Sequence, residues 1–497
     1  MHRLLRTVML VLLALGAGPL LPGADGWPIV VRRGVALYEG EIPFRFFGVA
    51  AANLHHHESH LRPDFSNRFP DEYETRDLLE TMHRLGARAT RSFSLSVSSA
   101  RDGGVPGYLM GRRIYNEEAF RCLDRVLALC HEYDVRVIIP LVASQSFPNV
   151  GGVDEFAAWS GKTAPGAFWV DPEVKADFRA LIDYLANRRN TVSGILYRDD
   201  PAILAWQLGN EFDSYAPDRK LPAGPWKQAI TGWSLEMAVY LKQVDPRHLV
   251  MEAGGNREAM LASPAIDVMS AHLYEYWNRL GGGETDLANC LRKELAVSAG
   301  RKPLIVDEFG LASLDNIRSL MEAIRRSDVV GGLIWGLRVH RRDGGFYYHN
   351  EGGTNVNSYH YPGFPAGEAY QEKGVFQLLH DEGPAISGRP APTQAPPTPA
   401  PVLFATARGL TWRGSTGAAF YQLESADSGS GPWTTVGERL PDSLPLDVAA
   451  YEAGGDSAPL TLWTAGASAG NVRFYRIRGG NEAGWTEYSR PLRVSLP

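Results

Sequence analysis

The sequence predicts a (β/α)8 barrel followed by a small all-β domain, and three observations lead to this fold class. Short apolar runs alternate with helical patterns through most of the chain before residue 390. A proline-rich stretch then interrupts the pattern, and beyond it apolar and polar residues alternate without a helical period. The 497 residues, 44% hydrophobic and 21% charged, have the composition of a folded globular protein rather than of a disordered one.

Eight apolar runs are candidate barrel strands: Phe44–Ala50, Ala87–Ser94, Val135–Ala143, Ile203–Gly209, His248–Gly254, Val268–Tyr274, Pro303–Gly310 and Gly331–Arg338. Helical patterns separate most of them, at Thr75–Leu85, Glu117–Tyr133, Pro172–Arg188, Trp226–Val244 and Leu314–Arg326. Strands that are apolar throughout and alternate with helices form a parallel sheet covered on both faces, and eight such units close into a barrel. A short hairpin around Val30–Tyr38 is expected at the bottom of the barrel.

Shifts in composition divide the chain into four segments. Residues 1–24 have a basic start, an apolar centre and a small-residue end, typical of a signal peptide, so we expect a secreted protein, extracellular or periplasmic. Residues 27–383 form the expected barrel. Residues 384–401 include six prolines between Pro390 and Pro401, which predicts a semi-rigid linker. Residues 402–497 have the short strands and Gly/Ser/Asp-rich turns of a β-sandwich.

The charge of the chain excludes several classes of function. A net charge of −6 gives no bulk electrostatic reason to bind nucleic acid or an anionic membrane. No apolar stretch reaches the ~20 residues of a membrane-spanning helix, so no membrane contact is expected after signal removal. We expect a monomer.

Cysteine and histidine patterns give no metal site. Cys122 and Cys130 lie on one predicted helix with an axial separation of ~12 Å, which is too far for a disulfide. With Cys290 they are expected to be three buried thiols, and no CxxC pattern is present. The run His55–His60 offers imidazole and carboxylate groups, but adjacent histidines point in different directions. We expect no metal and no cofactor.

Two glutamates end predicted strands, at the edge where barrel enzymes carry their active sites. Glu211 follows strand four directly after Asn210, and Glu308 ends strand seven. Two carboxylates flanking one bond are what glycoside hydrolysis needs, because one protonates the leaving oxygen while the other attacks the anomeric carbon or activates water.

Four further side chains converge on the same edge. They are Arg91 after strand two, His272 and Tyr274 after strand six, and Trp335 in strand eight. Each one alone has an ordinary structural explanation, such as an ion pair or a core aromatic. Their coincidence with the two glutamates predicts an active site, in which Arg91 keeps the nucleophile ionised by the proximity of its charge.

With these motifs the sequence resembles family five of the glycoside hydrolases, within the large clan of (β/α)8 retaining enzymes. The shared features are Asn-Glu after strand four, His-x-Tyr after strand six, Glu-Phe-Gly after strand seven and Trp on strand eight. Gly151–Gly161 and Arg188–Trp206 resemble the endo-β-1,4-mannanases of that family more closely. The resemblance spans roughly residues 28–380. In the tail, Phe474–Gly484 followed by Tyr488-Ser489 resembles the last strands of a fibronectin type III domain.

The resemblance implies a role for each matched residue. Glu211 would be the general acid/base and Glu308 the nucleophile of a retaining double displacement, with carboxyl groups ~5–5.5 Å apart. Asn210 would hydrogen-bond the sugar 2-hydroxyl, and Arg91 and Tyr274 would orient Glu308. His272 would support the acid/base region, and Trp335 would form the floor of a subsite.

Positions that line the expected cleft depart from the mannanase pattern, so the substrate is less constrained than the reaction type. Asn53 after strand one is a candidate substrate-binding residue, but it is followed by Leu-His-His instead of x-Tyr and an aromatic. Gln207 stands where Glu is usual. Candidate platforms for sugar stacking are Trp159, Trp169 and Trp277. The aromatic loop His340–Tyr361 after strand eight is a candidate wall of the cleft.

The sequence therefore predicts a secreted enzyme that cuts β-1,4-mannan or glucomannan at internal bonds, with the polysaccharide as its partner. An endo-β-1,4-glucanase and an exo-β-mannosidase stay open, since the long strand-eight loop could block one end of the cleft. A non-catalytic glycan-binding barrel is the alternative from a different class, and the intact glutamates disfavour it. The fibronectin-like domain is expected to be a spacer or partner contact, unless Trp433 or Trp485 is exposed for sugar binding.

Overall fold

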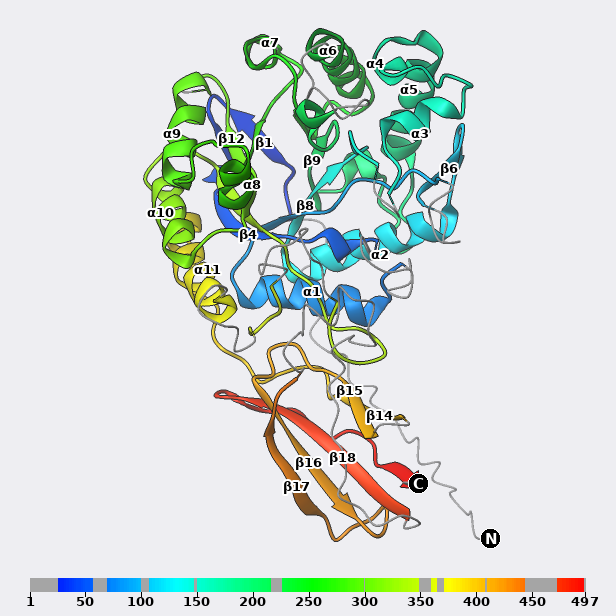
Figure 1. The fold of residues 1–497 in the computed structure, drawn as a ribbon, viewed down its shortest axis with the longest axis vertical. Helices are drawn as coiled ribbons and strands as arrows, with labels where there is room; N and C mark the ends of the chain where they lie inside the picture. The colour runs from blue at the N-terminus through cyan, green and yellow to red at the C-terminus, as the bar shows by residue number, and fades with distance from the viewer. Residues whose placement is uncertain are drawn as a thin grey trace, which may run out of the picture.

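The computed structural model describes residues 26–56, 69–99, 107–146, 150–215, 226–298, 300–347, 359–363, 371–406, 409–442 and 472–495. The predicted signal peptide lies outside these residues. Within them, a large α/β part precedes a smaller all-β part (Figure 1).

Eight parallel strands form a nearly closed barrel in the large part. They are β4 (Phe46–Ala50), β5 (Ala89–Arg91), β8 (Arg136–Pro140), β9 (Ile203–Gln207), β10 (Leu249–Met251), β11 (Met269–Tyr274), β12 (Leu304–Gly310) and β13 (Gly331–Trp335). The ladder runs from β10 through β4 to β11, and a parallel bridge between Met251 and Val268 joins its two edges. Each strand lies within a run predicted from the sequence, and the arrangement is that of a (β/α)8 barrel.

Helices surround the barrel (Figure 1). They are α1 (Glu72–Arg84), α2 (Glu117–Tyr133), α3 (Val153–Ala158), α4 (Ala167–Val170), α5 (Pro172–Asn187), α6 (Lys227–Val244), α7 (Arg257–Ala262), α8 (Glu275–Leu280), α9 (Leu287–Ser298), α10 (Leu314–Arg325) and α11 (Glu372–Ser387). The five predicted helices are among them. Helix α1 begins earlier than predicted because Asp71 and Glu74 form a capping box that satisfies its first N–H groups.

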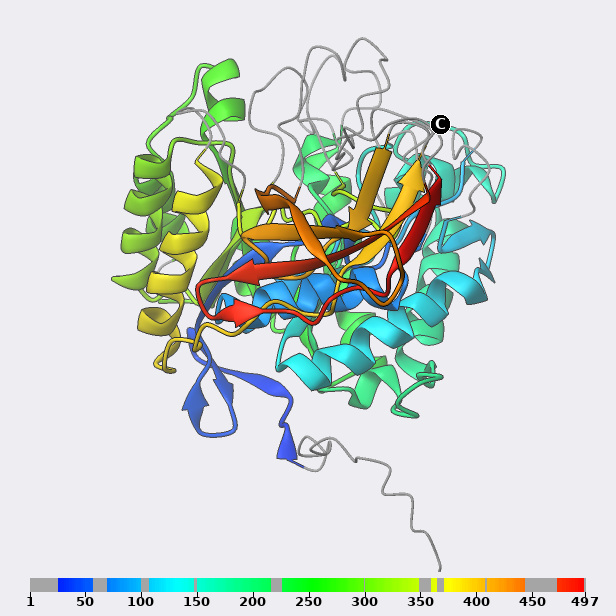
Figure 2. The ribbon, with the colours of Figure 1, turned by 90° about the horizontal axis from the view of Figure 1, so that it is seen from below.

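A small antiparallel sheet precedes the barrel, made of β1 (Val30–Arg33), β2 (Ala36–Glu39) and β3 (Ile42–Pro43). Glu39 at the end of β2 pairs with Arg88 and, at 2.6 Å, with Arg136. These arginines stand at the amino ends of β5 and β8. The sheet therefore covers the bottom of the barrel, as expected; it is the dark blue hairpin in Figure 2.

The all-β part contains β14 (Val402–Thr406), β15 (Gly409–Arg413), β16 (Phe420–Ala426), β17 (Thr434–Leu440), β18 (Val472–Asn481), β19 (Gly484–Trp485) and β20 (Leu492–Ser495). Strands β14 and β15 form one sheet, and the other strands gather around β16 and β18. A core that includes Trp412, Tyr421 and Ile477 joins the two sheets. This part lies across the side of the barrel that carries α1 and α2 (Figures 1 and 2).

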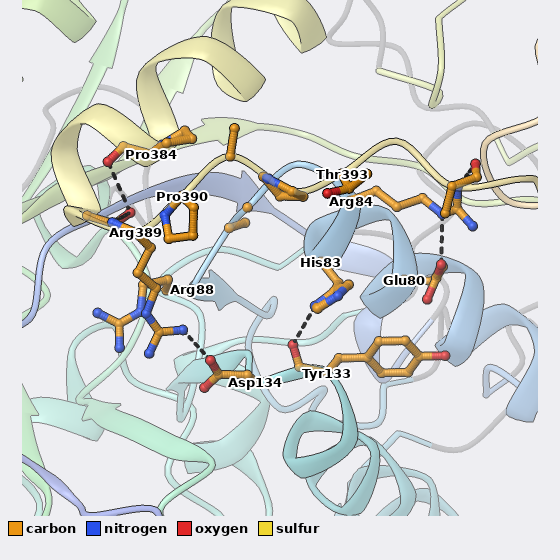
Figure 3. A pocket seen from close by; sticks show the side chains of 16 residues that line it. Glu80, His83, Arg84, Arg88, Tyr133, Asp134, Pro384, Arg389, Pro390 and Thr393 are labelled. Atoms are coloured by element: carbon orange, nitrogen blue, oxygen red, sulfur yellow. Dashed lines mark hydrogen bonds and ion pairs between the residues drawn. The ribbon is translucent and has the colours of Figure 1, made fainter. Parts of the chain in front are cut away.

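The proline-rich segment packs against the carboxyl ends of α1 and α2. Helix α11 continues to Ser387, past the expected boundary at residue 383. Arg84 at the end of α1 donates to two linker carbonyls, at 2.9 and 2.8 Å. A pocket of about 560 Å³ remains between linker and helices (Figure 3), and across it Arg389 pairs with Asp134. The linker is thus held to the barrel surface at several points.

The structure also tests the predictions about cysteine and membrane contact. Cys122, Cys130 and Cys290 are all buried and free, as predicted. Burial raises the pKa of the Cys122 thiol to about 12, so it is unreactive at neutral pH. Across the described ranges, no helix has both the length and the apolar character needed to cross a membrane.

Candidate active site

The mouth of the barrel brings together the two glutamates predicted from the sequence. Glu308 lies on β12, and Glu211 follows β9. One oxygen of Glu211 lies within 4.8 Å of one oxygen of Glu308. This separation is close to the ~5–5.5 Å between carboxyl groups of retaining glycosidases and shorter than the ~6.5–9.5 Å of inverting ones.

Glu308 is buried and held by two donors. Arg91 at the end of β5 donates from Nη1 to Oε1 at 2.5 Å, and the Tyr274 hydroxyl at the end of β11 donates to Oε2 at 2.5 Å. Burial raises the pKa of Glu308 and the neighbouring Glu211 adds to the increase, whereas His272 and Arg91 oppose it. An ionised Glu308 therefore depends on these two cations.

Glu211 is the more exposed of the pair, since 35% of its side chain is accessible against 6% for Glu308. Its backbone is left-handed, with φ of 52°, a conformation that is uncommon outside glycine and is found at strained functional sites. Two residues earlier, a Cβ on Gly209 would lie 2.3 Å from the Phe212 ring, so this turn requires glycine. Asn210 between them accepts from Arg91 Nη2 at 2.7 Å.

His272 connects both glutamates. Its Nδ1 lies 2.9 Å from Glu211 Oε1 and 3.3 Å from Glu308 Oε2, and its Nε2 lies 3.3 Å from Asp307 Oδ2. Burial lowers the pKa of His272, but Glu308 and Asp307 outweigh burial and hold it well above its usual value. The imidazole is therefore a cation near neutral pH, and both ring nitrogens donate.

The remaining predicted residues lie around this network. Trp335 at the end of β13 is 6% exposed and packs against Phe93 and under the Arg338 guanidinium. Asn53 is buried in the short 3-10 helix Ala52–Leu54 that follows β4. Trp277 stands on the outer surface of α8, 43% exposed. Trp335 and Asn53 thus stand at the carboxyl ends of β13 and β4, the edge of the barrel that carries the two glutamates, and Trp277 follows β11 on α8.

Residues 71–327, more than half of the chain, match a family described as GH family 5 beta-mannosidase-like. The chain belongs to this family. Glu211, Glu308 and their hydrogen-bonding partners Asn210, His272, Tyr274 and Arg91 all fall inside the matched residues.

Several curated relatives of this glycoside hydrolase family 5 chain are plant proteins. The mannan endo-1,4-beta-mannosidase 4 of Oryza sativa subsp. japonica is 30% identical over 263 residues, which are 46% of this chain and 53% of the relative. The putative mannan endo-1,4-beta-mannosidase 5 of the same organism is 26% identical over 318 residues, 56% of this chain and 60% of the relative. The chain thus spans little more than half the length of these relatives.

Solved structures support the fold. An endo-1,4-beta-mannanase from Rhizomucor miehei aligns with a TM-score of 0.57 at 18% identity, over 73% of this chain and 100% of that one. An endo-beta-1,4-mannanase from Thermotoga petrophila aligns with a TM-score of 0.54 at 16% identity, over 91% and 98%. At these identities the likeness shows a shared barrel architecture.

One expectation about sugar-binding aromatics in this family 5 chain is wrong. Trp169 is 1% exposed and packs edge-on against Phe212 and Trp233 in the core, so it offers no face to a sugar. In the described part of the strand-eight loop, Phe346, Tyr347 and Tyr359 are buried, and Phe346 stacks on His340. The wall of the cleft stays a prediction for this loop. Residues 348–358 of that loop and 57–60 of the histidine run lie outside the described residues.

Sequence reasoning missed Asp307, the residue directly before Glu308. Neighbours on a regular strand point to opposite faces. The pairing of β12 with β13 shifts register between Val306 and Phe309, and both carboxylates reach the interior of the barrel. The available signal was a second carboxylate in an otherwise apolar strand. Gln207, noted only as a departure from the mannanase pattern, turns out to be its partner at 2.9 Å.

Proposed function

We propose that the protein is a retaining, endo-acting β-1,4-mannanase that hydrolyses mannan or glucomannan. The proximity of Glu211 and Glu308 carries the proposal, because a retaining mechanism needs two carboxyl groups at this spacing. Their different surroundings support different roles. Glu308 is buried between Arg91 and Tyr274 and suits the nucleophile, whereas the more exposed Glu211 suits the acid/base.

The proposed reaction has two steps. Glu308 attacks the anomeric carbon while Glu211 gives its proton to the glycosidic oxygen, so the glycosidic bond breaks as a glycosyl ester forms on Glu308. Glu211 then takes a proton from water, the resulting hydroxide hydrolyses the ester, and the sugar leaves with retained configuration. We assign the binding of the sugar 2-hydroxyl to Asn210, which accepts a hydrogen bond from Arg91. The protons and electron pairs balance between the two carboxyl groups, substrate and water.

The choice of mannan rests on the family and on relatives named as mannan endo-1,4-beta-mannosidases. Trp335 beside Glu308's strand is proposed as the floor of the subsite that holds the attacked sugar, and exposed Trp277 as a stacking face farther along the chain of sugars. An exo-β-mannosidase and an endo-β-1,4-glucanase share this catalytic geometry and differ in their products.

For the rest of the chain we propose secretion through residues 1–24, a monomeric state and a fibronectin type III-like fold for the all-β part. Trp485 is 40% exposed, but the Arg478 guanidinium lies 4.3 Å from its ring centre. Arg476 lies in the same way 4.4 Å from Trp433. Because arginine covers one face of each ring, a contact role suits this domain better than sugar binding.

Product analysis on linear mannan, glucomannan and cellulose tests the proposal, comparing wild type with Glu308→Ala. Glu258→Ala, whose side chain is 66% exposed on α7, is the matched control. Short mannooligosaccharides from wild type and control, absent with Glu308→Ala, would support it. Mannose alone would favour the exo enzyme, and cellooligosaccharides from cellulose the glucanase. No product from any polymer would count against the mannanase and leave two interpretations: subsites that select another glycan, or a barrel that only binds.

A further inference from the structure

The carboxylate of Asp307 lies directly beneath the mouth of the barrel with no exposed surface. Its Oδ1 accepts from the Ser270 hydroxyl at 2.6 Å and from the Ala271 N–H at 3.1 Å. Its Oδ2 accepts from the Gln207 side-chain amide at 2.9 Å. A buried group with donors on both oxygens occupies one fixed orientation.

Both cations of the candidate active site also contact Asp307. Arg91 Nε lies 3.2 Å and His272 Nε2 lies 3.3 Å from Oδ2. Burial raises the pKa of Asp307, yet His272 and Arg91 outweigh it, and the pKa lies well below its usual range. Asp307 is therefore an anion bonded to the side chains that hold Glu211 and Glu308.

We propose that Asp307 is a positioning residue that acts on the acid/base through His272; this inference rests on the proposed role of Glu211. While Asp307 accepts from Nε2, the imidazole keeps both protons, and Nδ1 donates to Glu211 Oε1. The catalytic proton of Glu211 then resides on its other oxygen. From that oxygen it passes to the glycosidic oxygen of the substrate.

Loss of the Asp307 carboxylate reverses the direction of the hydrogen bond between His272 Nδ1 and Glu211. Glu308 and Asp307 together hold the pKa of His272 up against burial, so loss of the Asp307 carboxylate lowers that pKa. In the neutral ring that then forms, Nε2 keeps its proton and Nδ1 becomes an acceptor. Protonated Glu211 then donates to Nδ1 and holds its proton away from the substrate. Cleavage of the glycosidic bond becomes slower only where the leaving group needs that proton. The rate with a poor leaving group should therefore fall more than the rate with a good one.

The primary test compares Asp307→Asn with wild type on two aryl β-mannobiosides. Phenol is the poor leaving group and 2,4-dinitrophenol the good one. We expect kcat/KM to fall about 100-fold on the phenyl substrate and less than about 5-fold on the dinitrophenyl one. Equal losses on both would overturn the proposal, because general damage to the site does not depend on the leaving group.

Two further variants separate positioning from folding. Gln207→Glu combined with Asp307→Asn places a carboxylate beside Arg91, whose Nε is 2.7 Å from Gln207 Oε1, without placing it on His272. We expect this double variant to recover stability and to keep the leaving-group dependence; recovery of both would count against the route through His272. Asp245→Asn removes another buried carboxylate, 2.7 Å from His248, and should lower stability without changing the leaving-group ratio.

A second measurement does not depend on hydrolysis. Nitrogen NMR of the His272 ring, assigned with His272→Gln, should show both nitrogens protonated at pH 7 in wild type and one in Asp307→Asn. A neutral ring in wild type would overturn the inference even if the enzyme is active. A different outcome is a protein that cleaves no mannan while its His272 ring is charged in wild type and neutral in Asp307→Asn. That result would support the coupling of Asp307 to His272 and would count against the proposed function alone.

Discussion

Two histidines of this protein each hydrogen-bond a carboxylate from both ring nitrogens, and their roles differ. His272 at the mouth of the barrel lies between Glu211 and Asp307. His340, on the loop after β13, lies 3.0 Å from Asp77 on α1 and 2.6 Å from Asp442 of the all-β part. Each imidazole therefore joins segments that are far apart in the sequence.

The difference between the two sites is access. His272 and its partner Glu211 are partly exposed, and a substrate can reach the carboxyl group. His340 is 1% exposed, and both of its partners are buried. The Thr416 hydroxyl completes the second site by donating to Asp77 at 2.6 Å. We call the group around His272 the open site and the group around His340 the covered site. The open site suits proton transfer, because one carboxyl group is accessible to a substrate. The covered site suits attachment of one domain to another, because all of its groups are buried.

The largest effect is expected from Glu308→Gln at the open site. The amide keeps the shape of the side chain but has no charge with which to attack the anomeric carbon, so kcat should fall by about 10⁴-fold or more. Turnover of mannan by the variant and by Glu258→Gln measures this. A variant with more than a tenth of wild-type kcat would assign the nucleophile to another residue.

The covered site should govern stability at alkaline pH. Burial lowers the pKa of His340, but Asp77 and Asp442 raise it to about 10 overall, against 6.5 when the residue is free. Its contribution, on the order of 5 kcal/mol, is fully present below pH 6.5 and is lost as the pH rises through 10. Tyr73 and Tyr421 keep their protons in this window, because burial raises their pKa values well above 10.

Denaturant unfolding of wild type and His340→Gln between pH 6 and 10 measures this contribution. The difference in unfolding free energy between the two proteins should shrink steadily over that range, while kcat at pH 7 stays near wild type. A constant difference would show that His340 is neutral in the folded protein. If His340→Gln also lost most of its kcat at pH 7, the roles of His340 and His272 would not be separate.

Arg91→Lys should have a smaller but clear effect on the open site. Three nitrogens of Arg91 bond Gln207, Glu308 and Asn210, at 2.7, 2.5 and 2.7 Å. A lysine keeps the charge but cannot match this planar geometry, so kcat/KM on mannan should fall about 100-fold. Arg76→Lys, at a half-exposed surface pair on α1, is the control and should change nothing. If Arg91→Lys had wild-type kinetics, a positive charge beside Glu308 would be enough and the planar geometry of arginine would not be needed.

Much of the fold and of the open site could be predicted from the sequence, and the covered site could not. Barrel strands are buried on both faces, so their composition alone marks them, and the fold places their ends together. Glu211 and Glu308 were found in this way. Asp307 was missed because only the register shift in β12 turns it inward. The partners of His340 lie 263 and 102 residues away, and no local pattern connects them.

The smallest expected effect concerns Trp277 on α8, which is 43% exposed and packs edge-on against Tyr276. A sugar stacked on its free surface would bind equally in the ground state and the transition state, since it is not the sugar that reacts. Trp277→Ala should therefore raise KM for mannan about five-fold, close to 1 kcal/mol, with kcat unchanged. Trp485→Ala, exposed to a similar extent in the all-β part, is the control and should leave KM unchanged. An unchanged KM in Trp277→Ala would place the sugar chain on another face of the barrel mouth, whereas a rise with Trp485→Ala would give the all-β part a share in holding the polymer.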